Sequence, residues 1–193
     1  MFNHLPPIIL ASISPRRKAL LTEIGLSFMV EPSSVHEDFT IDLAPEDFAQ
    51  HYAKQKAMDI SYRNHDSLVI GADTIVVLGN RILGKPKNAT ESYDMLSSLS
   101  GTTHTVMTGV SLQAKSLEID HTFIEKTKVQ FKELSNIEIN YYIENYEPFD
   151  KAGSYGIQDW FSVCVEKIEG CFYNVVGFPL SAFYKEIDNI FGT

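Results

Sequence analysis

The sequence predicts a single α/β domain over residues 1–193, with a mixed sheet flanked by helices. Stretches with helical periodicity alternate with strand-like stretches along the whole chain, which is typical of helices packed on a sheet. Two long strand patterns follow each other at 103–115 and 118–134, which predicts an antiparallel ribbon. The 193 residues are 44% hydrophobic, and no repeat or linker divides them, so one sizeable core is expected.

The first elements are marked by local start and stop signals. Ser14 can cap a helix whose first turn begins at Pro15, and Gly25 can end that helix. A second helix begins near Pro45 and carries small and apolar residues along one broad face. The predicted elements in this part are strands at 8–11 and 26–32, helices at 15–24 and 45–64, and a polar connection at 33–39.

The centre of the chain predicts a long strand followed by a tight turn. Residues 67–79 have a strand pattern, either continuous or interrupted near Gly71–Asp73. Gly79–Asn80 is typical of a two-residue hairpin turn, and the strand pattern resumes over 81–86. An Asn-x-x-Glu capping signal then predicts a helix over 88–100.

The last third combines a helix start signal with two cysteines. Ser135 and Glu138 match a capping box, which predicts the start of a helix. Cys164 and Cys171 show neither a CxxC motif nor zinc-finger spacing. A cross-strand disulfide is the alternative, but a cytoplasmic setting favours two reduced thiols, which are expected here. The predicted elements here are a helix at 136–146, a loop at 147–159, a strand at 161–170, and a turn leading into a helix at 177–191.

The overall composition disfavours several kinds of partner. A net charge of −9 and a pI of about 5.1 disfavour generic binding to nucleic acid or to an anionic membrane surface. The longest apolar stretches are too short to span a membrane, and the first ten residues lack signal-peptide features. A cytoplasmic protein without nucleic-acid or membrane partners is expected, and a local basic pocket could still bind a small anion.

The stretch "LASISPRRKALL" predicts an anion site. Ser12 and Ser14 offer hydroxyl groups where a helix begins, and the backbone N–H groups of a helix N-terminus bind phosphate. Arg16 and Arg17 add charge at a place where the helix dipole disfavours cations, so an anionic ligand would explain them. The alternative is an ordinary capped helix with two solvated arginines.

The stretch "GADTIVVLGNRILGKPKN" places a carboxylate in the middle of an apolar strand. Asp73 is therefore a candidate metal ligand or general base; the alternative is a buried aspartate satisfied by backbone or a lysine. Residues 79–85 match G-x-x-x-x-G-K, but Pro86 replaces the Ser or Thr of a P-loop, so that motif is rejected. Lys85 remains a candidate phosphate-binding cation.

Two further stretches carry polar side chains that suit a binding site. Glu37 and Asp38 could reach a divalent cation, and the alternative is a solvated turn. Lys56 lies among small and apolar residues on its predicted helix, where it could neutralise an anion. In "DKAGSYGIQD", Gln158 offers both a donor and an acceptor, as the recognition of a nucleobase edge requires. No histidine pattern or nucleophile motif supports hydrolysis through a protein nucleophile.

Taken together, these stretches resemble the Maf family of nucleoside triphosphate pyrophosphatases. Five collinear matches cover the chain nearly end to end: "LASISPRRKALL", "GADTIVVLGNRILGKPKN", "MLSSLSGTTHTVMTGVSL", "DKAGSYGIQ" and "YNVVGFPL". The resemblance implies two lobes around a nucleotide cleft, a fold related to inosine triphosphate pyrophosphatases, and cleavage between the α and β phosphates. It also implies a divalent metal (Mg²⁺ or Mn²⁺) and suggests a homodimer.

The same resemblance implies a role for each candidate residue. Asp73 is the expected catalytic base, and with Glu37 it is the expected metal ligand. The expected substrate-binding residues are Ser12, Arg16, Arg17, Lys56, Thr74, Lys85 and Gln158.

The subfamily follows from three positions that match members acting on dTTP and UTP: Arg16, Thr74 and Gln158. The alternatives are the sister specificity for 7-methyl-GTP, in which Gln usually replaces Thr74, and a non-catalytic nucleotide-binding regulator of cell division. Asp159 and Trp160 depart from the family pattern after Gln158, which bears on fine substrate preference.

Overall fold

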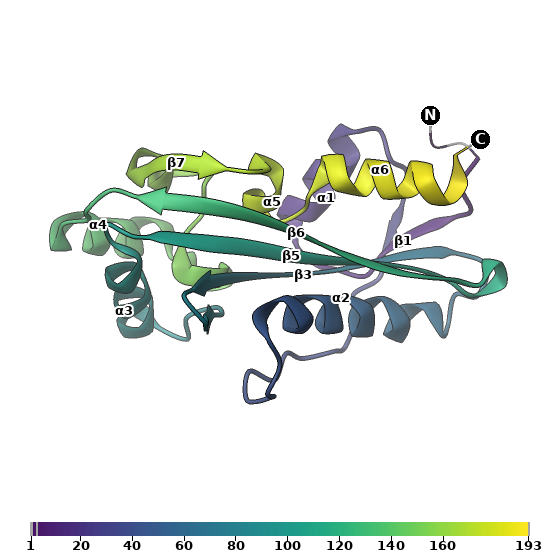
Figure 1. The fold of residues 1–193 in the computed structure, drawn as a ribbon, viewed down its shortest axis with the longest axis horizontal. Coiled ribbons are helices and arrows are strands. Elements are labelled where there is room, and N and C mark those ends of the chain that lie inside the picture. Colours follow the sequence, from purple (N-terminus) through teal and green to yellow (C-terminus); the bar gives the residue numbers. More distant parts are fainter. Residues whose placement is uncertain (1, 3, 193) are drawn as a thin grey trace.

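The computed structural model describes residues 2 and 4–192, and it confirms a mixed α/β fold. One sheet runs along the long axis of the molecule in the order β2-β1-β3-β5-β6-β7, with β4 also paired to β3 (Figure 1). β1, β2 and β3 pair in parallel, whereas β3, β5, β6 and β7 form an antiparallel series. The sheet is therefore mixed, as the alternating sequence pattern predicts.

The three central strands are long, and the outer strands are short. β5 and β6 pair along almost their whole length, from Thr103 opposite Gln130 to Ala114 opposite Ile119. The strands are β1 (Ile8–Leu10), β2 (Met29–Val30), β3 (Leu68–Leu78), β4 (Arg81–Leu83), β5 (Thr103–Ala114), β6 (Ile119–Phe131) and β7 (Val165–Glu169).

Helices cover both faces of the sheet. α2 lies along one face, α1, α5 and α6 lie along the other, and α3 and α4 are grouped at one end (Figure 1). The α-helices are α1 (Pro15–Glu23), α2 (Pro45–Ser61), α3 (Ala89–Leu99), α4 (Asn136–Tyr146), α5 (Phe172–Val176) and α6 (Leu180–Phe191). The 3₁₀ turns are η1 (Lys115–Leu117), η2 (Pro148–Asp150), η3 (Ala152–Ser154) and η4 (Trp160–Cys164).

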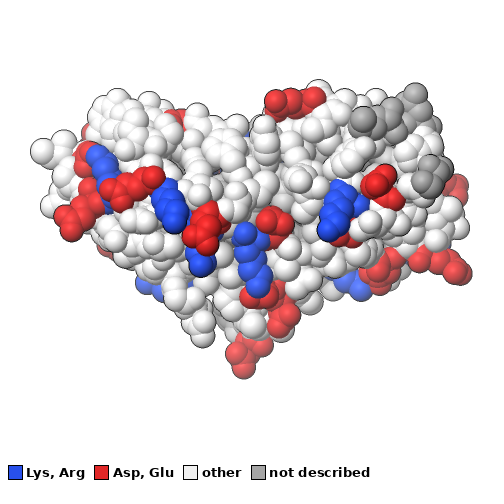
Figure 2. All heavy atoms as spheres, turned by 45° about the horizontal axis from the view of Figure 1, so that its top comes forward, with Lys and Arg blue, Asp and Glu red and all other residues white. Residues whose placement is uncertain are grey.

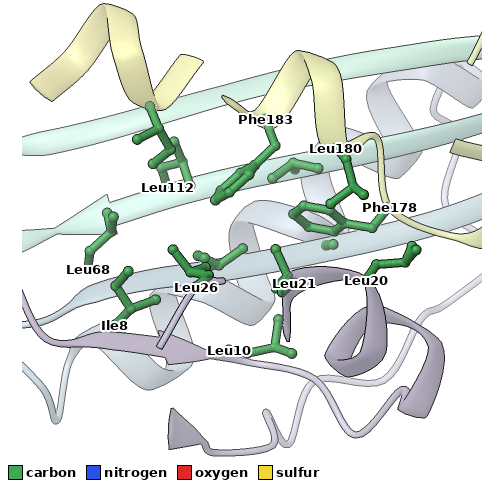
Figure 3. Close-up of a cluster of buried hydrophobic side chains, with 14 of the residues drawn as sticks. Ile8, Leu10, Leu20, Leu21, Leu26, Leu68, Leu112, Phe178, Leu180 and Phe183 are labelled. Carbon is green, nitrogen blue, oxygen red and sulfur yellow. The ribbon is translucent and has the colours of Figure 1, made fainter. Parts of the chain in front are cut away.

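Two large hydrophobic cores lie on the long sheet and define two lobes. In the first lobe, side chains of α1 and α6 pack against β1, β3 and β5 (Figure 3). In the second, α3 and α4 pack around Phe131, Tyr142 and Phe161, which are fully buried. The long strands link the lobes, because β3 places Ile70 in the first core and Val76 in the second.

α2 approaches the sheet unusually closely because glycines face it. A Cβ on Gly71 would overlap Ala53 O and lie 2.6 Å from Ala57 N, and a Cβ on Gly109 would lie 2.6 Å from the carbonyl carbon of Ala49. Such contacts are too short for any side chain, so only glycine permits this packing. The close approach fixes α2 against the middle of β3.

Of the two expectations for residues 67–79, the structure confirms the continuous strand, since β3 runs through Asp73. The structure differs from the expected elements elsewhere: β2 covers only two residues of the expected strand at 26–32. The expected strand at 161–170 begins as η4, because the Asp159 carboxylate caps that turn by accepting a hydrogen bond from Phe161 N. The short helix α5 was not predicted, since five residues carry too little periodicity.

The cysteines are free thiols, as expected, with Cys164 buried in the second lobe. Within the described residues, no helix combines the length and the apolarity needed to cross a membrane. Acidic and basic side chains are interspersed over the face shown in Figure 2.

Candidate active site

The site lies at a gap in the pairing of β3. Pairing with β1 ends near Ile70, whose carbonyl accepts a hydrogen bond from Ala11 N (2.8 Å), and pairing with β4 begins only at Val76. Between them, residues 71–75 pair with β5 on one side and with no strand of the described chain on the other. The gap leaves the centre of β3, including Asp73 and Thr74, beside an open space.

A cavity of about 620 Å³ occupies this region and is lined from both lobes. Its lining comes from 11–17, from 150–152 and 155–159, and from parts of 32–37 and 175–177. Five of the lining residues are Lys or Arg, and three are Asp or Glu, although the whole chain is acidic. The cations are Arg16, Arg17, Lys56, Lys85 and Lys151. This local excess of positive charge suits an anionic ligand.

Lys56 links two carboxylates at the edge of this cavity. Its Nζ lies 2.7 Å from Asp73 Oδ1 and also donates to Glu37 Oε1. Lys56 and Glu37 line the cavity, whereas Asp73 is only 5% exposed and lies behind them. The second oxygen of Asp73, Oδ2, is buried without a hydrogen-bond partner in the described structure. Buried carboxylate oxygens are normally satisfied, so this one is available to a ligand.

The electrostatics of the two carboxylates differ. Burial raises the pKa of Asp73, and the ammonium of Lys56 offsets only part of this effect. Burial would also raise the pKa of Glu37, but Lys56, followed by a backbone hydrogen bond and then by Lys85, brings that pKa below its ordinary value. Asp73 is thus the carboxylate better suited to accept a proton, and Glu37 the one better suited to remain charged.

These two carboxylates also fit a divalent metal. Mg²⁺ is commonly held by one or two carboxylates, with water and substrate phosphates completing its coordination. The unpartnered Asp73 Oδ2 supplies an oxygen ligand, and Glu37 lies within reach of the same Lys56 ammonium. No group of three or more His, Cys, Asp and Glu side chains that could hold a metal occurs in residues 2 and 4–192.

Arg17 lines the cavity, but most of its donors are bound to the protein. Its Nε donates to Gly177 O (3.0 Å), one terminal nitrogen donates to Ala72 O (2.9 Å) and to Ser12 Oγ, and the other donates to Thr74 Oγ1 (2.9 Å). None of these acceptors is charged, and burial lowers the pKa of Arg17. Arg17 therefore closes the edge of β3 and places a fixed positive charge at the cavity wall.

Thr74 is held in the same network. Its hydroxyl lies 3.0 Å from Thr108 Oγ1 and 3.3 Å from Gly177 O. The helix α5, which precedes Gly177, is tied to β5 and β6 because Asn174 Nδ2 donates to Val106 O and Thr127 Oγ1. Thr74 thus shapes the cavity from a rigid position between the sheet and α5.

Arg16 spans the cavity mouth. Its guanidinium lies 2.8 Å from the carboxylate of Asp150 on η2, so it joins α1 of the first lobe to the second lobe. Asp150 also accepts a hydrogen bond from Lys151 Nζ (2.8 Å). An anionic ligand in the cavity would compete with Asp150 for Arg16 and Lys151.

The structure brings every expected site residue to this cavity or its immediate wall. Lys85 is exposed at its rim, and Gln158 projects from the loop that follows Gly156. Asp38, the second carboxylate expected to reach the cation, is the exception: it does not line the cavity, and its carboxylate accepts hydrogen bonds from Thr40. Sequence reasoning did not find Asp150, Asn174 or the Gly177 carbonyl, because their partners are distant in sequence.

The sequence profile of the Maf-like protein family matches residues 7–190. The chain belongs to this family. Its Maf-family relatives include a protein from Bacillus cereus (strain ATCC 10987 / NRS 248) named "dTTP/UTP pyrophosphatase", which is 47% identical over 96% of this chain and 90% of its own length. Proteins of the same name from Bacillus cereus (strain AH820) and Bacillus anthracis are each 48% identical over 93% of both chains.

The fold of this Maf-family chain is also similar to a solved structure, "Structure of a HAM1 protein from Coxiella burnetii". The TM-score is 0.51 at 13% sequence identity, and the match covers 95% of this chain and 98% of the other. At this identity the similarity concerns the fold alone, and it confirms the expected architecture of a mixed sheet between flanking helices.

Proposed function

We propose that the protein hydrolyses dTTP and UTP to the nucleoside monophosphate and pyrophosphate. The observation that carries the proposal is the buried Asp73, with a raised pKa and an unpartnered oxygen, beside a cation-rich cavity. The names of the Bacillus relatives, which are nearly half identical over nearly the whole chain, support the choice of substrate.

The triphosphate would lie among the cations of the two lobes. Arg16, Lys56 and Lys85 have donors that a phosphate can reach, whereas Arg17 contributes charge more than free donors. The N-terminus of α1 also faces the cavity, since Ser14 and Pro15 line it. Positioning and charge neutralisation of this kind are the main contributions of proteins to phosphoryl transfer.

Glu37 and Asp73 would hold a Mg²⁺ or Mn²⁺ ion together with phosphate oxygens. When bound, such an ion offsets the charge of the phosphates and favours attack by water. The ammonium of Lys56, which contacts both carboxylates, would compete with such an ion for the same oxygens. The metal itself is a proposal that rests on the charge and geometry of these carboxylates.

Asp73 would accept the proton of the water that attacks the α-phosphorus. A general base works best when its pKa lies near the working pH, and burial raises the pKa of Asp73 in that direction. The bond between the α-phosphorus and the bridging oxygen breaks, and pyrophosphate leaves. The cations around it stabilise its charge.

Gln158 would pair with the edge of the uracil or thymine base, and Thr74 would shape the wall nearby. Both side chains line the cavity. An amide presents both a donor and an acceptor, which matches the acceptor and donor of a pyrimidine edge.

The proposal also includes a cytoplasmic site of action and a homodimer.

Pyrophosphate release from a panel of nucleotides tests this function directly. The panel contains dTTP, UTP, GTP and 7-methyl-GTP, each with Mg²⁺ or Mn²⁺. Release from dTTP and UTP supports the proposal; preference for 7-methyl-GTP would keep the reaction and overturn the assigned specificity. Tight binding without release from any nucleotide would favour a non-catalytic nucleotide-binding regulator.

A further inference from the structure

The loop that carries Gln158 is fixed on both sides of that residue. Gly156 N donates to Tyr142 Oη (3.0 Å), and the side chain of Ile157 is buried in the core of the first lobe. On the other side, Asp159 Oδ1 accepts a hydrogen bond from Phe161 N (3.0 Å). Gln158 is the exposed residue of this segment, so its orientation depends on how its neighbours are held.

One hydroxyl group joins the two ends of the loop. Tyr142 Oη accepts from Gly156 N and donates to Asp159 Oδ2 (3.1 Å), so it spans the segment from Gly156 to Asp159. The loop is drawn in tightly, because a Cβ on Gly156 would lie 2.7 Å from Asp159 Oδ2. Burial and the Asp159 carboxylate raise the pKa of Tyr142, which keeps the hydroxyl protonated as a donor.

The ring of Tyr142 is held independently of its hydroxyl. It is fully buried, its centroid lies 4.7 Å from that of Phe161, and it stacks on Tyr146 at 5.2 Å and on Trp160 at 6.2 Å. Tyr142 does not line the cavity. It can therefore influence a ligand only through the loop that its hydroxyl holds.

We propose that Tyr142 and Asp159 are positioning residues that orient Gln158 for recognition of a pyrimidine base. The inference rests on the proposed function, in which Gln158 contacts the base. A side-chain amide discriminates between bases only if its N–H and C=O groups are held in a fixed orientation. Hydrogen bonds within the supporting loop hold that orientation. A loosened loop would bind the triphosphate as before and distinguish bases less well.

The test compares the affinities of two nucleotides that differ only in the base. The fluorescence of Trp160, the single tryptophan, reports binding of the α,β-imido analogues of dUTP and dGTP, which resist cleavage between those phosphates. Tyr142→Phe removes the hydroxyl and keeps the ring. We expect it to lower the pyrimidine-to-purine affinity ratio by about three- to tenfold, the range of one net hydrogen bond.

Tyr141→Phe is the matched control, because Tyr141 also contacts Trp160 but is 43% exposed. We expect its ratio to equal that of the wild type. Asp159→Asn is a second variant that should also lower the ratio. The lost negative charge should change the affinities of both analogues equally, because they carry the same triphosphate. This effect therefore cancels in the pyrimidine-to-purine affinity ratio.

A double-mutant cycle with Gln158→Ala separates positioning from a general loss of structure. If Tyr142 acts through Gln158, Tyr142→Phe lowers the ratio in the wild type and leaves it unchanged in Gln158→Ala. The inference is overturned if Tyr142→Phe lowers the affinity ratio equally in the wild type and in Gln158→Ala, or if it lowers the ratio in neither. If Gln158→Ala lowers the ratio and Tyr142→Phe does not, the proposed base contact survives without the positioning role. If Gln158→Ala has no effect, both fail.

Discussion

Lys56 and Asp73 form an ion pair across the interface between a helix and a strand, with 2.7 Å between Nζ and Oδ1. Lys56 lies on α2, and Asp73 lies on β3 at the gap between β1 and β4. The pair is possible because Gly71 and Gly109 allow α2 to approach the sheet so closely. The packing of the fold and the chemistry of the site therefore depend on the same few residues.

Asp73→Asn should remove nearly all turnover and leave the fold intact. The amide cannot accept the proton of the attacking water, so we expect kcat for dTTP to fall by about 10²- to 10⁴-fold. Pyrophosphate release measures the activity, and the melting temperature checks the fold. Asp120→Asn is the control, because Asp120 pairs with Lys54 outside the cavity. Near-normal turnover in Asp73→Asn would exclude Asp73 as the base.

Lys56→Met should destabilise the protein more in the presence of a chelator than in the presence of Mg²⁺. Without the ammonium, Glu37 and Asp73 face each other unneutralised, and a bound cation can replace it. Thermal melts with EDTA and with Mg²⁺ measure the difference. Lys54→Met is the control, because Lys54 lies on the same helix but is 40% exposed. Its melting temperature should change little with EDTA or with Mg²⁺. If the melting temperatures of the two variants differed equally between EDTA and Mg²⁺, metal binding at Glu37 and Asp73 would be contradicted.

Gly109→Ala should reduce both stability and activity. The added Cβ would collide with the backbone of Ala49 and push α2 away from the sheet. Overpacking of this kind costs about 1–3 kcal/mol of unfolding free energy. The displacement would also move Lys56 away from Asp73, so we expect kcat/KM for dTTP to fall as well. Urea denaturation and pyrophosphate release measure the two effects, and an unchanged midpoint would show that α2 accommodates the methyl group.

Arg16→Ala should raise KM and lower kcat for dTTP, because the phosphates that bind are also the ones that react. Arg16 is held by Asp150 at the cavity mouth, and its removal should change stability only slightly, as for other exposed ion pairs. Arg63→Ala is the control, since Arg63 pairs with Glu31 outside the cavity. A loss of stability without any kinetic change would make Arg16 a structural residue alone.

Stability should fall as the pH decreases from about 6.5 to about 4, in part because of His104. This side chain is buried against Phe131, its Nε2 lies 2.9 Å from Tyr155 Oη, and burial lowers its pKa from 6.5 to about 4. The unfolded chain therefore takes up a proton first as the pH falls, and the native state is disfavoured by up to about 3 kcal/mol. Below the folded pKa, this contribution should decrease no further.

His104→Gln isolates that contribution, because an amide can still reach the Tyr155 hydroxyl but does not titrate. We expect the unfolding free energy of the variant to depend less on pH between about 4 and 6.5 than that of the wild type. Denaturant unfolding at half-unit pH steps measures the two curves. Parallel curves would show that His104 does not cause the pH dependence.

The sequence by itself determined the fold class and most of the elements. Capping signals at Ser14, Asn88 and Ser135 mark the starts of α1, α3 and α4, and each side chain accepts the expected backbone hydrogen bond. Such signals work because they satisfy backbone groups locally. The mid-strand carboxylate of Asp73 and the paired arginines were visible for the same reason, since each is unusual for its local structure.

Only the tertiary structure decided how these residues act together. It assigned the donors of Arg17 to internal acceptors, joined Lys56 to both Glu37 and Asp73, and placed Tyr142 behind the Gln158 loop. These partners are between 14 and 160 residues apart along the chain. A local pattern cannot specify such contacts, because they depend on how the lobes, the long strands and the close-packed α2 fit together in space.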